Sequence, residues 1–88
     1  MNEIIRKIYT DILNKMRYND FRVDDLLPMK WICLTYRFQL NPEEQRYLGE
    51  AIEYLISNGY VTLEGTNEGR IIDGLVLTQA GYDFIYGN

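Results

Sequence analysis

The sequence predicts a single α+β domain, spanning residues 1–88, with three helices, a β-hairpin and a short closing helix. Two stretches carry this prediction. Residues 40–61, LNPEEQRYLGEAIEYLISNGYV, are typical of a capped helix that passes through a glycine directly into a strand. Downstream, two β-rich runs flank a Gly/Asn-rich loop, which is the pattern of a hairpin. A chain of 88 residues is short enough to have one core and little spare stability.

Residues 3–17 are predicted to form the first helix. Asn2 is suited to the N-cap, and Glu3 is favourable at the positive end of the helix dipole. Seven apolar residues recur at helical spacing and make one stripe: Ile4, Ile5, Ile8, Tyr9, Ile12, Leu13 and Met16.

Residues 25–38 carry two conflicting patterns. As a helix, the segment would be capped by Asp24, with Pro28 tolerated in the first turn. In contrast, the apolar residues at positions 32, 34, 36, 38 and 40 alternate, as they would in a strand. We predict a helix, because the order of the other elements leaves room for one here, but a strand stays open. The helical stripe would consist of Leu27, Trp31, Leu34 and Phe38.

Residues 42–57 are predicted to form the third helix. Asn41 caps it, Pro42 takes the first helical position, and Glu44 follows Asn41 at the spacing of a capping box. Gly59 is expected to end it in the left-handed conformation. Its buried stripe would consist of Leu48, Ala51, Ile52, Leu55 and Ile56.

The hairpin is predicted over residues 60–77, and a short helix over 79–86 with Thr78 as its N-cap. Gly81 inside that helix costs about 1 kcal/mol relative to alanine, which predicts close packing against a neighbour. The predicted core combines residues from all these elements: Ile8, Ile12, Trp31, Leu34, Leu48, Ile52, Leu55, Val61, Leu75 and Leu77.

The composition argues against several classes of protein. No apolar run approaches the roughly 20 residues that a membrane span needs. The chain has no histidine, so it lacks the usual general base and the commonest metal ligand. Cys33 stands alone, which excludes an intramolecular disulfide and favours a cytoplasmic location. We therefore expect no cofactor, no metal site and no enzymatic activity.

The net charge of −4 is unevenly distributed. Residues 1–40 carry seven basic and five acidic side chains, whereas residues 41–88 carry two basic and eight acidic ones. An acidic C-terminal half disfavours nucleic acid as its partner, because affinity for DNA depends on neutralising phosphates with Lys and Arg.

The stretches AIEYLISNGYVTLEG and LVLTQAGYDFIY resemble the third helix, wing and closing helix of winged helix-turn-helix domains in small bacterial and phage regulators. The resemblance implies a three-helix core, a β-hairpin wing and a short C-terminal helix. It also implies that the outward face of the third helix enters the major groove. That face would carry Glu43, Glu44, Arg46, Tyr47 and Glu50, and the wing tip Thr66, Asn67, Glu68 and Arg70.

Several of these residues have an equally direct structural interpretation. Glu43 and Glu44 suit a helix start, and Arg46 and Glu50 are spaced for a solvated ion pair. Tyr47 and Tyr54 lie seven residues apart and would form either a core edge or an interface strip.

Three functions stay open. The first is a winged-helix module that binds a protein partner or a second copy, since the acidic half and the tyrosines favour protein contacts. An aromatic C-terminal helix beside an apolar first helix is how many winged-helix proteins dimerise. The second is a DNA-binding transcriptional regulator that reaches phosphates with Lys30, Arg37, Arg46 and Arg70. The third and least favoured is an enzyme.

Overall fold

The protein is described by a computed structural model that covers residues 2–65 and 72–87. Within these residues the fold is α+β, with five helices and a three-stranded antiparallel sheet. The helices are α1 (Glu3–Tyr18), α2 (Met29–Trp31), α3 (Pro42–Arg46), α4 (Leu48–Ser57) and α5 (Gln79–Tyr86). A π-helical turn, η1 (Ile32–Tyr36), and a 3-10 turn, η2 (Arg37–Gln39), continue α2. The strands are β1 (Leu26–Pro28), β2 (Val61–Gly65) and β3 (Ile72–Leu77).

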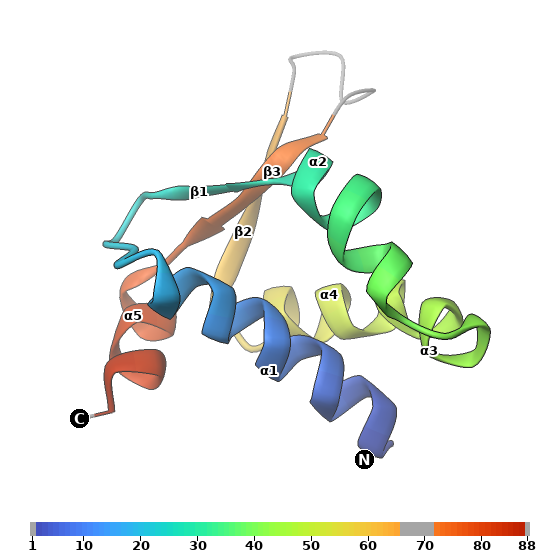
Figure 1. The fold of residues 1–88 in the computed structure, drawn as a ribbon. Coiled ribbons are helices and arrows are strands. Elements are labelled where there is room, and N and C mark those ends of the chain that lie inside the picture. The colour runs from blue at the N-terminus through green and yellow to red at the C-terminus, as the bar shows by residue number, and fades with distance from the viewer. Residues whose placement is uncertain (1, 66–71, 88) are drawn as a thin grey trace.

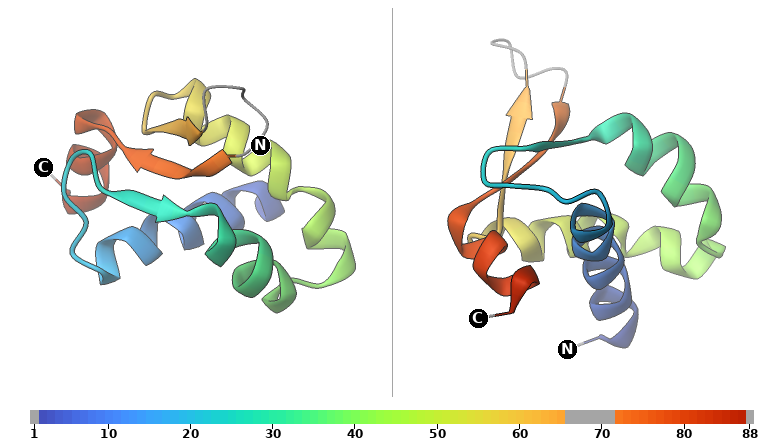
Figure 2. Two further views of the ribbon diagram at one scale, coloured as in Figure 1. Left: turned by 90° about the horizontal axis from the view of Figure 1, so that it is seen from above. Right: turned by 60° about the vertical axis from the view of Figure 1, so that its left-hand side comes forward.

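The sheet has the order β1-β3-β2, so the strand between the first two helical segments joins the hairpin (Figure 1). β3 lies in the centre and pairs Leu75 with Leu27 on one side and Leu63 on the other. Gly74 makes this close pairing possible, because a Cβ there would overlap the backbone carbonyl of Leu27. The helices lie mainly on one side of the sheet, with α1 crossing below it (Figures 1 and 2).

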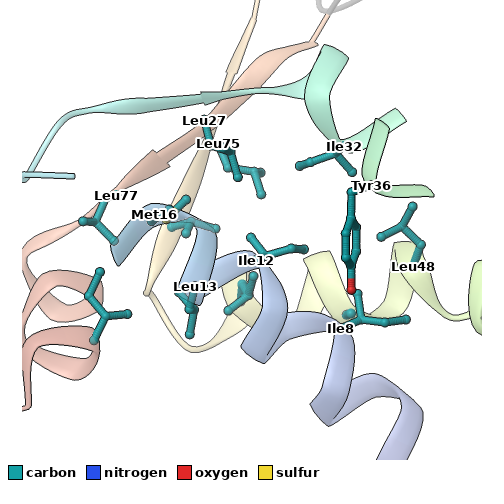
Figure 3. Close-up of a cluster of buried hydrophobic side chains, with 14 of the residues drawn as sticks. Ile8, Ile12, Leu13, Met16, Leu27, Ile32, Tyr36, Leu48, Leu75 and Leu77 are labelled. Carbon is teal, nitrogen blue, oxygen red and sulfur yellow. The ribbon is translucent and has the colours of Figure 1, made fainter. Parts of the chain in front are cut away.

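One hydrophobic core lies between α1, η1, α4, α5 and the inner face of the sheet (Figure 3). Seven of the ten predicted core residues belong to it, and among them Leu55, Val61, Leu75 and Leu77 are fully buried. Trp31 and Ile52 are only partly buried and pack on its edge. The core consists of Ile8, Ile12, Leu13, Met16, Leu27, Ile32, Tyr36, Leu40, Leu48, Ala51, Leu55, Val61, Leu75, Leu77 and Ile85.

The predicted helix ends are confirmed by their hydrogen bonds. The Asn2 side chain accepts from Ile4 N at 2.7 Å, and Thr78 Oγ1 accepts from Gly81 N at 3.0 Å. Gly59 has φ of 76°, and the N–H of the following residue donates to the Leu55 carbonyl, as a left-handed helix ending requires. The local sequence signals therefore determined where three of the helices begin and how α4 ends.

The prediction for residues 25–38 was wrong in two respects. Residues 26–28 form strand β1, so the helical segment starts at Met29, and Asp24 does not cap it but has φ of 76°. The stripe was also misplaced, because Leu34 and Phe38 are 68% and 69% exposed. Ile32, Tyr36 and Leu40, spaced by four, face the core instead.

A wide π turn lies within this segment. The N–H of Arg37 donates to the carbonyl of Ile32, five residues earlier, so each turn here holds more residues than an α-helix does. Side chains four apart then stay aligned along the inner face. A regular helix with 3.6 residues per turn also aligns positions four apart, so periodicity alone could not choose between the predicted stripe and the observed one.

The predicted helix 42–57 is interrupted at Tyr47. This residue ends α3 and precedes α4, with φ of −97° and ψ of 0°. The N–H of Tyr47 bonds to Glu44, and its carbonyl accepts from Ala51, so the two helices follow one another with a single bent residue between them.

Candidate interaction surface

The outward face of α3 and α4 is acidic. Glu43, Glu50 and Glu53 are exposed on it, and Arg46 is the cation that accompanies them. Among residues 2–65 and 72–87, no ion pair joins Arg46 to Glu50, so the predicted pairing of these two side chains is not made. The carboxylates of this face are therefore solvated by water and are not paired with a neighbouring cation among the described residues.

Glu44 does not belong to this outward face. Its Oε1 accepts from Asn41 N at 3.0 Å, while Asn41 Oδ1 accepts from Glu44 N at 2.8 Å, so the predicted capping box is formed. Its second oxygen lies 3.7 Å from Lys7 Nζ on α1. Both contacts are structural, and they assign Glu44 to the start of α3 and its attachment to α1.

Tyr47 and Tyr54 are half-buried and both pack inward. Tyr47 lies against the core at the junction of α3 and α4. The Tyr54 ring stacks on Tyr9 of α1, with centroids 4.6 Å apart and planes 12° from parallel. Burial, followed by the nearby Tyr54 hydroxyl, raises the pKa of Tyr9. The core-edge interpretation thus accounts for the main contacts of both tyrosines.

A second polar cluster connects α1 to the segment that follows β1. The Tyr36 hydroxyl donates to Asp11 Oδ2 at 2.7 Å, and Lys7 Nζ donates to the same oxygen at 3.3 Å. Burial, followed by the hydrogen bond to Asp11, raises the pKa of Tyr36. With the Lys7–Glu44 contact, one connected set of side chains spans α1, η1 and α3.

The turn between η2 and α3 is held by Gln45. Its side-chain amide donates to the carbonyls of Arg37 at 3.2 Å and Leu40 at 3.1 Å. These carbonyls lie at the end of the preceding helical segment, and the Arg37 carbonyl also accepts from the Leu40 N–H at 3.1 Å. The two helical segments are therefore fixed to one another by a side chain that no sequence motif had indicated.

Lys30 and Arg37 are exposed on residues 29–39. This segment precedes the acidic residues of α3 and α4 and has no carboxylate of its own. Leu34 and Phe38, which were predicted to face the core, are exposed there as well. The alternation of apolar residues at positions 32–40 contained the signal, since it includes both the inner set and the outer set. Asn67 and Arg70, predicted at the wing tip, lie outside the described residues.

A groove of about 400 Å³ runs between α1 and α5. Phe84 borders it, is 52% exposed, and stacks on Tyr60 with ring centroids 4.5 Å apart. Arg6 and Arg17 border the groove from α1. α1 and α5 thus lie side by side along this groove, and Phe84 of α5 is exposed at its edge.

In the described part of the chain, no three His, Cys, Asp or Glu side chains are grouped as a metal would require. No helix there has the length and apolar character of a membrane span. Comparison of the chain with protein-family models, curated proteins and solved structures finds no significant match.

Proposed function

We propose that the chain is a winged-helix regulatory module without enzymatic activity, which acts by contacting other proteins and binds DNA at most weakly. The order helix, strand, two helical segments and hairpin, with a β1-β3-β2 sheet, supports the winged-helix assignment. In such a module α3 and α4 together would be the recognition helix, and β2 and β3 the wing.

The charge of the outward face of α3 and α4 carries the proposal. A recognition helix enters a groove lined by phosphates, where Glu43, Glu50 and Glu53 would be repelled and Arg46 alone attracted. A single glutamate can accept a hydrogen bond from a cytosine amino group, but three leave the phosphate charge unneutralised. Contact with a protein surface has no such electrostatic cost.

The runner-up is a DNA-binding transcriptional regulator. The exposed cations Lys30, Arg37 and Arg46 favour it, since a winged helix also contacts phosphates through its second helix. A DNA-binding function requires these three cations to outweigh the exposed carboxylates of α3 and α4.

Fluorescence anisotropy with a labelled random duplex, measured over a series of salt concentrations, separates the two functions. We expect binding weaker than the ~10⁻⁴–10⁻⁶ M of dedicated non-specific binders at physiological salt. A sub-micromolar affinity that falls steeply with added salt, and that is lost in Arg46→Ala, would establish the DNA-binding function instead. Light scattering on the same sample reports whether a second copy is a partner.

A further inference from the structure

The outer face of residues 29–39 exposes two large apolar side chains next to each other. Leu34 and Phe38 are 68% and 69% exposed and four residues apart, so they lie along one line of the helical segment. Isolated exposed apolar residues are normal on protein surfaces, whereas adjacent ones mark interaction sites more often. We use the name outer face for Lys30, Cys33, Leu34, Arg37 and Phe38.

The interior contacts of this segment prevent the apolar pair from turning inward. Tyr36 is anchored to Asp11 at 2.7 Å and stacks on Trp31 with centroids 5.3 Å apart. Ile32 is fully buried on the same side (Figure 3). Rotating Leu34 and Phe38 into the core would break these contacts, so their exposure is built into the fold.

The π turn adds an independent observation. Its hydrogen bond from Arg37 N–H to the Ile32 carbonyl departs from regular α-helical geometry, and such turns are frequently found at functional sites. Here the turn begins two residues before Leu34 and ends two residues before Phe38. The turn therefore lies in the middle of the outer face: it contains Cys33 and Leu34, and the Arg37 N–H closes it.

The outer face is positively charged although the chain as a whole is negative. Residues 29–39 contain Lys30 and Arg37 and no carboxylate, in a chain of net charge −4. Lys30 precedes Leu34 by four residues and Arg37 follows it by three, so both cations are spaced to lie beside Leu34. A complementary surface would offer apolar side chains flanked by carboxylates.

We propose that the outer face is a docking surface for an acidic amphipathic helix of a partner protein. Apolar residues of that helix, at positions i, i+3 or i+4 and i+7, would pack along Leu34 and Phe38. Its glutamates and aspartates would lie beside Lys30 and Arg37. This inference rests on the proposed protein-binding function and names the surface and the chemistry of the partner.

Other occupants fit the outer face less well. Duplex DNA would gain two cations but would bring its phosphates against two exposed apolar side chains. A second copy that contributed its own outer face would bring Lys30 and Arg37 close to the same cations of its partner. An acidic amphipathic helix satisfies both the apolar and the cationic part of the surface.

The probe for the test is a synthetic amphipathic peptide of about 18 residues, long enough to form a helix, with leucine on one face and glutamate on the other. A control peptide carries lysine in place of every glutamate. Titrated into the ¹⁵N-labelled full chain, the acidic peptide should shift amide resonances of residues 30–38 and the lysine peptide should not.

Two double variants separate the apolar from the electrostatic part. Leu34→Ser with Phe38→Ser should weaken the acidic peptide about tenfold or more, because anchor residues dominate such contacts. Lys30→Glu with Arg37→Glu should weaken it and reverse the preference towards the lysine peptide. Phe84→Ser, at an exposed aromatic residue on another face, is the matched control and should leave the affinity unchanged.

Equal binding of the acidic peptide to the Leu34→Ser/Phe38→Ser variant, or shifts confined to α1 and α5, would overturn the docking surface. Self-association of the chain that Leu34→Ser/Phe38→Ser abolishes would make a second copy the occupant and overturn the assignment to a foreign helix. A parallel titration with random duplex keeps the two proposals distinguishable. If the acidic peptide does not bind and the duplex binds weakly, only the docking surface is overturned. Tight duplex binding overturns the proposed function.

Discussion

The Tyr36 hydroxyl donates a 2.7 Å hydrogen bond to Asp11, joining η1 to α1 across 25 positions of sequence. Tyr36 is 4% exposed, and its ring extends from η1 to α1 through the core (Figure 3). Lys7 contacts the same carboxylate at 3.3 Å, which balances its charge. This pair fixes which side of residues 29–39 faces inward and thereby leaves Leu34 and Phe38 in solvent.

Tyr36→Phe should lower the free energy of unfolding by about 1–2 kcal/mol at neutral pH. The variant keeps the buried ring but removes a hydrogen bond to a charged group, and Asp11 is exposed enough for water to replace the hydroxyl in part. Urea denaturation followed by circular dichroism measures the change. No change in the midpoint would show that the bond contributes nothing net.

The same pair predicts a loss of stability at alkaline pH. Tyr36 has its pKa raised above 10.0 in the folded state, so the fold retains the proton that the unfolded chain releases. The stability is therefore fully present below pH 10.0 and falls as pH rises through that value, by up to about 1.4 kcal/mol per pH unit for one such group. Tyr36→Phe should reduce this slope. Tyr9, whose pKa is also raised, should contribute to the alkaline loss of stability that persists in Tyr36→Phe.

Glu44→Ala and Glu43→Ala should differ although the residues are adjacent. Glu44 closes the capping box and contacts Lys7, so its loss should cost about 1 kcal/mol. Glu43 is exposed and contributes through the helix dipole, so its loss should cost a few tenths of a kcal/mol. Thermal unfolding of the two variants side by side makes the comparison. An equal cost would contradict the structural role of Glu44.

Gly81→Ala and Gly49→Ala should have opposite effects. A Cβ at Gly81 would overlap the Tyr60 carbonyl and lie 2.7 Å from a Leu77 methyl group, so α5 would have to shift, at a cost of about 1–3 kcal/mol. A Cβ at Gly49 meets nothing within 4 Å, so alanine there should gain up to about 1 kcal/mol in helix propensity. A melting temperature that rose in Gly81→Ala would contradict the packing at Gly81, and one that fell in Gly49→Ala would contradict the open space at Gly49.

Leu55→Ala should cost about 2–5 kcal/mol, because Leu55 is fully buried and its removal leaves a cavity. Leu34→Ala is the control on the misassigned face, and its effect should stay within about 0.5 kcal/mol. Denaturant titration of both variants compares the two positions. A large loss for Leu34→Ala would mean that this side chain is buried in solution.

The sequence predicted best those features whose cause is local. The capping box at Asn41 and Glu44, the N-cap at Thr78 and the left-handed Gly59 each depend on residues within a few positions of one another. The α1 stripe was also readable, because α1 is a regular helix and its periodicity is undisturbed. Each of these signals has a physical cause that needs no knowledge of the rest of the chain.

The inner face of residues 29–39 could not be predicted in this way. It depends on the hydrogen bond between Tyr36 and Asp11 and on pairing of Leu27 with Leu75, 48 positions later. A three-residue strand and a π turn both escape a search for regular periodicity. For the same reason, the exposure of Leu34 and Phe38 follows from tertiary contacts and could not be predicted from the hydrophobic pattern.

The remaining prediction concerns α3 and α4 as a DNA-binding helix. Glu43→Gln, Glu50→Gln and Glu53→Gln together remove three exposed negative charges and leave Glu44 in its structural contacts. If this face would otherwise approach phosphates, the triple variant should bind random duplex more tightly than the unaltered chain and show a steeper dependence on salt.

The matched control replaces Glu3, Asp20 and Asp83, which are exposed on α1, the following turn and α5, by the corresponding amides. It changes the net charge equally, so a specific effect of the α3–α4 face requires the first variant to gain clearly more affinity than the second. Equal gains would show that net charge alone limits binding, and the assignment of α3 and α4 as the face nearest to DNA would then be wrong.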